Sequence, residues 1–321
     1  MRYSLLSRFE GCLLGAAVAE RLGAGYEENA IDLQKLAWFG VGSKNLSRSV
    51  STSRGIAIQK AAAEKLIKEG FVQKSFWQSL AEKENIDTVD VVLGTLPLAL
   101  YLHEQELKKK LSVQEACLNL PNGEFTQQVV LALGYGISLA LQEKLVKKVL
   151  IGETVERLQQ DLIGDGVLAN QLSRIQSSPE DDSGLETLLR VVGRDSVKGQ
   201  KPSTGEFLGQ TVPVAIAFDS FLRYSEDFRL CVIRALRAGK SPRLAALCAG
   251  ALCGAYVGVA GIPVAWTQAL SALELGVEEI EVRQMALELF AAWSGVYQNQ
   301  GSMIEAGRFG AVAAPLLLRR R

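Results

Sequence analysis

A segment without charge, rich in alanine and glycine, constrains this chain of 321 residues more than any other feature. It runs from Leu244 to Val259, follows Ser241-Pro242 and stops at Gly261-Ile262-Pro263. Serine is a common N-cap, proline fits the first helical position, and glycine followed by proline ends a helix. The sequence therefore predicts a helix over residues 244–259.

Three glycines of this predicted helix, Gly250, Gly254 and Gly258, are four residues apart and line one face. Each costs a helix about 1 kcal/mol relative to alanine, so keeping three of them requires a backbone or a ligand very close to that face. The uncharged run continues to Trp266, which is long enough to cross a bilayer. Because alanine and glycine replace the leucine, isoleucine and phenylalanine that favour insertion, we expect a buried core helix instead.

Bulk composition excludes some classes of function. With 48% hydrophobic residues and a formal net charge of zero, the chain can bury a sizeable core but has no basic field for nucleic acid. The five cysteines are odd in number and form no Cys-x-x-Cys pair. This pattern favours buried thiols in a cytoplasmic protein.

The chain has one histidine, His103, which limits the chemistry available to it. A zinc site built from histidine and cysteine would lack ligands, and a Ser-His-Asp or Cys-His site would need His103 itself. Because two acidic residues, Glu104 and Glu106, lie close to it in the sequence, we interpret His103 as a residue on a helix surface.

Helical periodicity dominates the chain and predicts an all-α fold. In the segment Gly55–Glu69 the apolar residues share one side, while Glu64 and Lys68 pair on the other. Further helices are predicted at Val129–Leu141, Ile151–Leu162, Val212–Leu222 and Glu278–Ala292. A loose stretch at about 176–206 has core-type helices on both sides, so we expect a single domain over residues 1–321 with one surface excursion.

Three segments together resemble the ADP-ribosylglycohydrolase family, which includes the dinitrogenase-reductase-activating glycohydrolase. The family opens with a Gly-x-Leu-x-Gly run, has a Gly, Thr, Ala and Phe pattern before its late helices, and ends with an Ala/Gly-rich helix and an Ile-Pro stop. The corresponding segments here are Arg8–Glu27, Ser203–Phe218 and Arg237–Pro263, with a weaker match at Thr95–Leu100.

This resemblance implies a compact, orthogonally packed helical domain that hydrolyses the N- or O-glycosidic bond between ADP-ribose and a protein side chain. It also implies two magnesium or manganese ions, held by carboxylates and hydroxyls from an early Thr-Asp-Asp-Thr segment and a late Asp-x-Asp-Thr segment.

The chain departs from the family at these metal-ligand positions. In the late motif Lys240 and Pro242 replace the two aspartates, and Arg243 replaces the threonine. The early motif reads Ser49–Arg54 and contains no carboxylate. Two divalent ions about 4 Å apart need several carboxylates to offset their repulsion. We therefore predict that the metal centre is lost, and that the protein has no metal site and no cofactor.

Some residues of this former pocket are candidates for other roles. Glu27 matches a family acid and is the one candidate catalytic residue, although a solvated loop explains it equally well. Lys240 and Arg243 flank a helix N-terminus that favours an anion, or they form an ordinary solvated helix end. The candidate ligand-binding residues are Lys240, Ser241, Arg243, Ser51, Thr52 and Ser53.

Other acidic residues suggest local roles. We interpret Glu20 and Arg21 as an ion pair on the surface of the first helix, and Asp87 and Asp90 as a helix cap.

Three functions follow from these residues. The first is a catalytically degenerate member of the family that binds a protein partner or an ADP-ribose-like ligand. The second is an active hydrolase of ADP-ribosyl bonds with an altered, metal-poor site that uses Glu27 and a further acid. The third is a membrane-associated helical protein, which depends on the uncharged run that ends at Trp266. We expect no nucleic-acid partner and no membrane.

Overall fold

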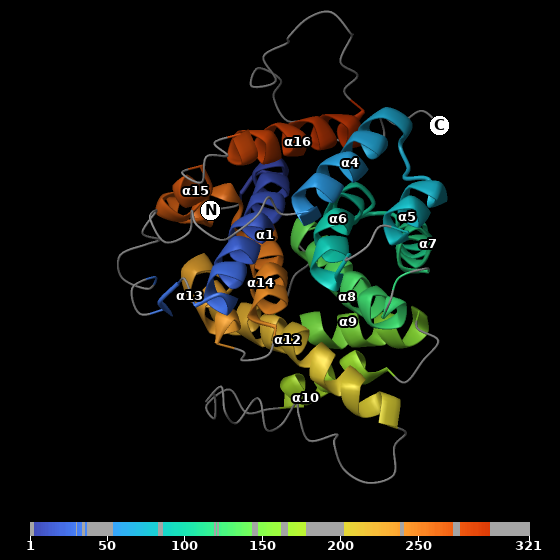
Figure 1. The fold of residues 1–321 in the computed structure, drawn as a ribbon, viewed down its shortest axis with the longest axis vertical. Helices are drawn as coiled ribbons and strands as arrows, with labels where there is room; N and C mark the ends of the chain where they lie inside the picture. Colours follow the sequence, from blue (N-terminus) through green and yellow to red (C-terminus); the bar gives the residue numbers. More distant parts are fainter. Residues whose placement is uncertain are drawn as a thin grey trace, which may run out of the picture.

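In the computed structural model the chain forms an assembly of α-helices around one hydrophobic core (Figure 1). The structure describes residues 3–29, 31–33, 36, 54–82, 86–118, 120, 122–142, 147–161, 166–177, 202–237, 241–271 and 277–295. Within these ranges there is no β-strand, so the prediction of an all-α fold is confirmed.

The helices keep the labels of Figure 1. They are α1 (Leu5–Glu27), α4 (Arg54–Glu69), α5 (Lys74–Ala81), α6 (Thr88–Tyr101), α7 (Glu106–Cys117), α8 (Gly123–Leu141), α9 (Lys147–Asp161), α10 (Val167–Ser177), α12 (Pro202–Tyr224), α13 (Phe228–Leu236), α14 (Pro242–Val257), the 3₁₀ turn η2 (Val259–Gly261), α15 (Val264–Ser271) and α16 (Val277–Ser294).

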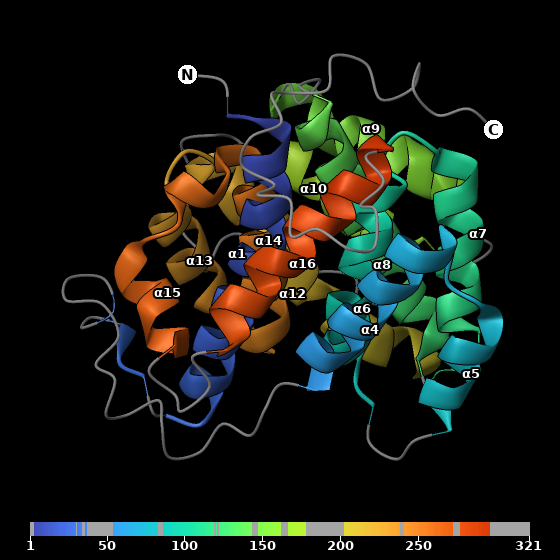
Figure 2. The same ribbon diagram turned by 90° about the horizontal axis from the view of Figure 1, so that it is seen from above.

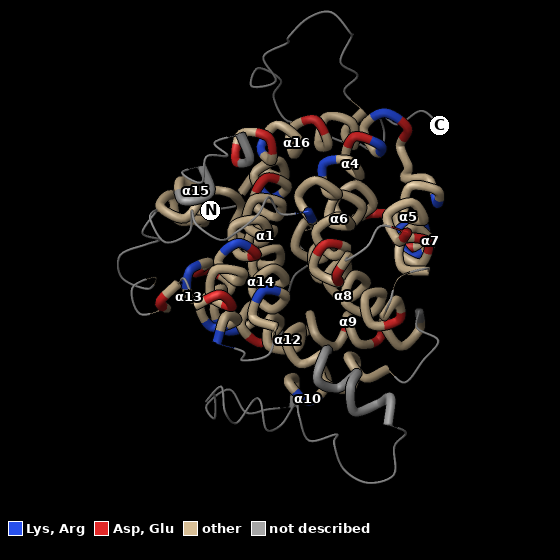
Figure 3. Tube along the Cα trace, in the orientation of Figure 1, with Lys and Arg blue, Asp and Glu red and all other residues tan. Residues whose placement is uncertain are grey.

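The glycine-rich segment forms α14, which packs side by side with α1 through the middle of the molecule (Figures 1 and 2). Pro242 is its first residue, and Gly258 ends it with a φ of 67°, a backbone conformation that favours glycine. The predicted boundaries of 244–259 are therefore correct to within two residues. Figure 3 shows that α14 carries almost no charge along its length.

Glycines on both helices explain how close α1 and α14 come. A Cβ atom added at Gly254 would lie under 3.0 Å from the backbone of Gly11, and one at Gly250 would also lie under 3.0 Å from the backbone of Gly15. Side chains of any size would therefore separate the two helices. The predicted close approach is a helix–helix contact, and the helix is buried as expected.

Other expectations are also met in part. The pair of Glu64 and Lys68 is present in α4 with an N–O distance of 3.9 Å, and all five cysteines are free and buried. The α12 helix begins at Pro202, inside the range assigned to the loose stretch, whereas residues 178–201 lie outside the described residues. None of the described helices is both long enough and apolar enough to cross a membrane.

Candidate functional site

The centre of the candidate site is an ion pair between Arg243, in the first turn of α14, and Glu20 of α1. Arg243 Nε donates to Glu20 Oε1 at 2.6 Å, and Arg243 Nη2 lies 2.6 Å from the same oxygen. The Glu20 side chain is 1% exposed, while that of Arg243 is 24% exposed. Two donors of one guanidinium thus converge on a single oxygen of a buried carboxylate.

Gly23, one turn after Glu20, allows Arg243 to reach this position. A Cβ atom added at Gly23 would lie under 3.0 Å from the Arg243 Cα atom. The backbone of α14 therefore lies directly against α1 at this point, and Gly23 leaves the space for it.

The start of α6 supplies a second carboxylate to the guanidinium. Arg243 Nη1 donates to Asp87 Oδ2 at 3.2 Å, while Asp87 Oδ1 accepts a hydrogen bond of 2.8 Å from the Asp90 backbone. The Asp90 side chain accepts a longer hydrogen bond, 3.5 Å, from the Asp87 backbone. Asp87 and Asp90 form a capping box, which confirms the predicted cap, and Asp87 also contacts the ion pair.

Glu27, near the end of α1, contacts the backbone of the same residue. Its Oε1 atom accepts a hydrogen bond of 3.2 Å from the Arg243 N–H group. Ser241 occupies the N-cap position of α14 with a φ of 48°, but its side chain makes no capping hydrogen bond. The exposed carboxylate of Glu27 therefore accepts the hydrogen bond that an N-cap side chain usually accepts.

Burial and neighbouring opposite charges shift the pKa values of these groups in opposite directions. Burial raises the pKa of the Glu20 carboxyl, and the nearby Arg243 and Arg21 only partly offset it. Burial and the neighbouring Asp87 likewise raise the pKa of Asp90. Burial opposes the charge on Arg243, but Glu20 and Asp87 outweigh it and raise the pKa of the guanidinium. The arginine is thus charged at any physiological pH.

The donor set around Arg243 does not fit a pair of divalent metal ions. Oxygens of Glu20 and Asp87 that could serve as ligands instead accept hydrogen bonds from the guanidinium. In the part of the chain that the structure describes, no three His, Cys, Asp or Glu side chains are grouped so that they could hold a metal ion.

Of the candidate residues, the structure brings together Glu27, Ser241 and Arg243. The remaining candidates lie outside the described residues: Lys240, Ser51, Thr52 and Ser53. Sequence reasoning missed Glu20 as a member of the site. Its signal was an acidic residue inside a helix segment, Gly11–Gly25, in which Arg21 is the one other charged residue.

Two local interpretations of the sequence are wrong. Glu20 and Arg21 are each 1% exposed, so they are not a surface pair, and Glu20 pairs with Arg243 instead. His103 is 2% exposed, and its ring packs against those of Phe9 and Trp293. The local sequence places charged side chains next to one another at these positions, but segments distant in the sequence cover them.

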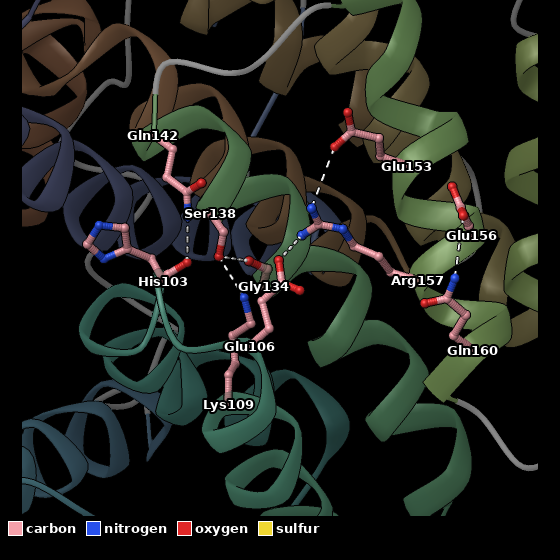
Figure 4. Close-up of polar contacts among 10 residues, drawn as sticks. All are labelled: His103, Glu106, Lys109, Gly134, Ser138, Gln142, Glu153, Glu156, Arg157 and Gln160. Atoms are coloured by element: carbon pink, nitrogen blue, oxygen red, sulfur yellow. Dashed lines mark hydrogen bonds and ion pairs between the residues drawn. The ribbon is translucent and has the colours of Figure 1, made fainter.

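A second set of polar contacts runs from His103, just before α7, through α7 and α8 to α9 (Figure 4). The Nδ1 atom of His103 lies 2.7 Å from the Leu100 carbonyl oxygen, and its own carbonyl accepts a hydrogen bond from Gln142. Lys109, 1% exposed, donates to Ser138 Oγ at 2.7 Å and lies over the ring of Tyr135. These groups are enclosed by packed helices, which makes them part of the core.

Comparison with known proteins gives one family. A sequence model of the family described as ADP-ribosylglycohydrolase matches residues 33–299. The match includes α6 and α14, which carry Asp87 and Arg243, but begins after α1. A comparison with curated individual proteins finds no match.

Proposed function

The chain belongs to the ADP-ribosylglycohydrolase family, and on that premise we propose that it is a binding or scaffold protein without the family's hydrolytic activity. The observation that carries the proposal is the position of Arg243, whose guanidinium is bonded to Glu20 and Asp87. The carboxylates that catalysis would need are therefore bonded to a positively charged side chain of the protein itself.

The chemistry of glycoside hydrolysis supports this proposal. Cleavage without a metal generally uses two carboxyl groups on either side of the scissile bond. Glu20 is 1% exposed and bonded to Arg243, while Asp87 and Asp90 cap α6. Glu27 and Asp87 are the exposed acids of the cluster, and Asp87 is bonded to the guanidinium, so Glu27 is the one exposed acid without such a contact. One such group is too few for an acid and a base.

A protein partner fits the site better than a phosphate-bearing ligand. Four carboxylates, those of Glu20, Glu27, Asp87 and Asp90, lie around Arg243, so an anion that approached its guanidinium would meet these acids as well. Glu27 also takes up the first N–H group of α14 that an anion would use. We therefore favour a protein ligand in the cytoplasm over ADP-ribose.

The second candidate function is hydrolysis by an altered site. Its support is that Glu27 and Glu20 both accept hydrogen bonds from one residue, Arg243. An exposed acid therefore lies near a buried acid, and burial raises the pKa of the buried one. Displacement of the guanidinium by a substrate would free Glu20 to act as a general acid.

Release of ADP-ribose from ADP-ribosylated arginine and serine substrates, with and without magnesium or manganese, tests both candidates. We expect no release above the rate of the substrate alone. A metal-dependent turnover near one per second, which is in the ordinary range of enzymes, would refute the proposal. A metal-independent turnover that Glu27→Gln abolishes would establish the altered hydrolase instead.

Titration with ADP-ribose at low and high salt tests whether the protein binds this ligand. We expect no binding at either salt concentration. Binding at low salt that weakens with salt and with Lys240→Ala would contradict the preference for a protein ligand, because it requires an accessible positive charge.

A further inference from the structure

The site that holds Arg243 has the features of a ligand site whose ligand is covalently tethered. The guanidinium contacts carboxylates of two other helices, at Glu20 in α1 and Asp87 in α6. The sequence separation is 223 residues in the first case and 156 in the second. No local turn or helix dictates either contact, so the surroundings of the guanidinium are built by tertiary packing.

The carboxylates contact the planar guanidinium on two of its edges. Nε and Nη2 of Arg243, on one edge of the guanidinium, approach Glu20 Oε1, while Nη1 on another edge approaches Asp87 Oδ2. A point charge such as an ammonium or a small metal ion cannot reach both acids with the same geometry. The second oxygen of Glu20, Oε2, is buried and has no hydrogen-bond partner among the described residues. This carboxylate therefore depends on the guanidinium.

We propose that Glu20 and Asp87 form a guanidinium-binding site and that Arg243 is its resident, tethered ligand. The guanidinium of Arg243, which is part of the chain, links α14 to α1 and α6. Without it, a cation from solution would have to bind between the acids. Emptying the site by Arg243→Ala leaves two acids, one of them fully buried, that accept a free guanidinium ion from solution.

Chemical rescue of Arg243→Ala tests this proposal through thermal stability. We expect the variant to melt well below the parent, and its Tm to rise with the logarithm of guanidinium chloride concentration in the low millimolar range, far below denaturing levels. The same additions should leave the Tm of the parent unchanged or slightly lower. Sodium chloride at equal ionic strength is the control for screening.

Two further variants separate specific binding from general effects. Arg234→Ala removes an arginine from another buried ion cluster, where Asp219 retains Arg223, so guanidinium should not raise its Tm. Combining Glu20→Ala with Arg243→Ala removes the buried acid as well. This double variant should melt above Arg243→Ala alone and gain nothing from guanidinium.

Several results would overturn the proposal. One is equal rescue by guanidinium and sodium chloride, and another is rescue by magnesium or manganese but not by guanidinium. A third is equal rescue of the double variant. If Arg243→Ala does not fold in plain buffer, its refolding yield with and without guanidinium provides the same comparison. Because these measurements report stability and not hydrolysis, their failure would leave the proposed function standing.

Discussion

Two buried ion clusters in this molecule are built in opposite ways. In one, a single carboxylate, that of Asp219 in α12, lies between two arginines: Arg223 bonds to Oδ1 at 2.9 Å, and Arg234 bonds to Oδ2 at 2.8 Å. In the other, a single guanidinium, that of Arg243, lies among carboxylates from α1 and α6. The first cluster thus places arginines around one acid, and the second places acids around one guanidinium.

The difference teaches how to tell a structural ion pair from a site. Both oxygens of Asp219 have donors, and the arginines that supply them come from the same helix or the next one in the chain. By contrast, the acids around Arg243 come from distant helices, and one oxygen of Glu20 has no partner within the described residues. Contacts from distant helices together with an unsatisfied buried oxygen are the two features that separate the Arg243 cluster from the Asp219 cluster.

The largest expected effect concerns the helix contact that carries the Arg243 cluster. Gly254→Leu should destabilise the protein by several kcal/mol or prevent folding, because even its Cβ atom would overlap the backbone of Gly11. Thermal denaturation measures the effect. Gly134→Ala in α8 is the matched control, since a Cβ atom there meets its nearest neighbours at 3.6 and 3.8 Å and should be tolerated. An unchanged Tm for Gly254→Leu would exclude the close crossing of α1 and α14.

The next effect compares the two clusters directly. Arg243→Ala should cost about 3–5 kcal/mol, the usual penalty for leaving a buried charge without its partner. Arg234→Ala should cost less, about 1–3 kcal/mol, because Asp219 keeps its hydrogen bond to Arg223. Urea denaturation of both variants gives the two values. Equal losses would mean that a buried acid left without its arginine costs no more stability than one that keeps a second arginine.

A smaller effect is expected in how the stability of Arg243→Ala depends on pH. The charges that act on Glu20 are Arg243 on α14, Arg21 on α1 and Asp90 on α6. Burial already raises the pKa of Glu20, and removing Arg243 should raise it further above its unfolded value. A carboxyl that binds its proton more tightly when folded adds stability as the pH falls.

The Tm difference between Arg243→Ala and the parent should therefore narrow as the pH is lowered from 7 toward about 5. Measuring both proteins at each pH cancels the titration of groups that Arg243 does not affect, while the pKa of Asp90, which Arg243 also lowers, shifts in the same direction as that of Glu20. A difference that stays constant, or widens in acid, would contradict the assignment of Glu20 as the partner of Arg243.

The smallest expected effect is at the surface. Lys68→Ala removes a pair with Glu64 whose side chains are 72% and 52% exposed, and solvent screens such charges. We expect a Tm within experimental error of the parent, in contrast to both buried clusters. A clear loss would show that exposed pairs contribute to this fold as much as buried ones do.

Much of the fold could be predicted from the sequence because its signals are local. The start of α14 at Pro242 and its end at Gly258 follow from residues within one turn of each boundary. The glycine face at Gly250 and Gly254 follows from their spacing, and it required a close neighbour of some kind. The Asp87–Asp90 cap is equally local and was predicted correctly.

The candidate site could be predicted only in part. Arg243 and Glu27 were named as candidates, but the sequence predicted an anion site or a solvated helix end rather than an arginine bound by acids. The prediction of a surface pair for Glu20 and Arg21 failed because adjacent opposite charges on a helix usually face solvent. A partner 223 residues away reverses that expectation.

The amino-acid sequence by itself determined that this chain is helical, where α14 lies, and that its glycines must contact something closely, because these depend on neighbouring residues. Tertiary structure alone decided that the contact is α1, that His103 is enclosed by Phe9 and Trp293, and that Glu20 and Asp87 share one guanidinium. Such choices depend on which surfaces meet across hundreds of residues. Burial then gives each charge a free energy that its local sequence does not reveal.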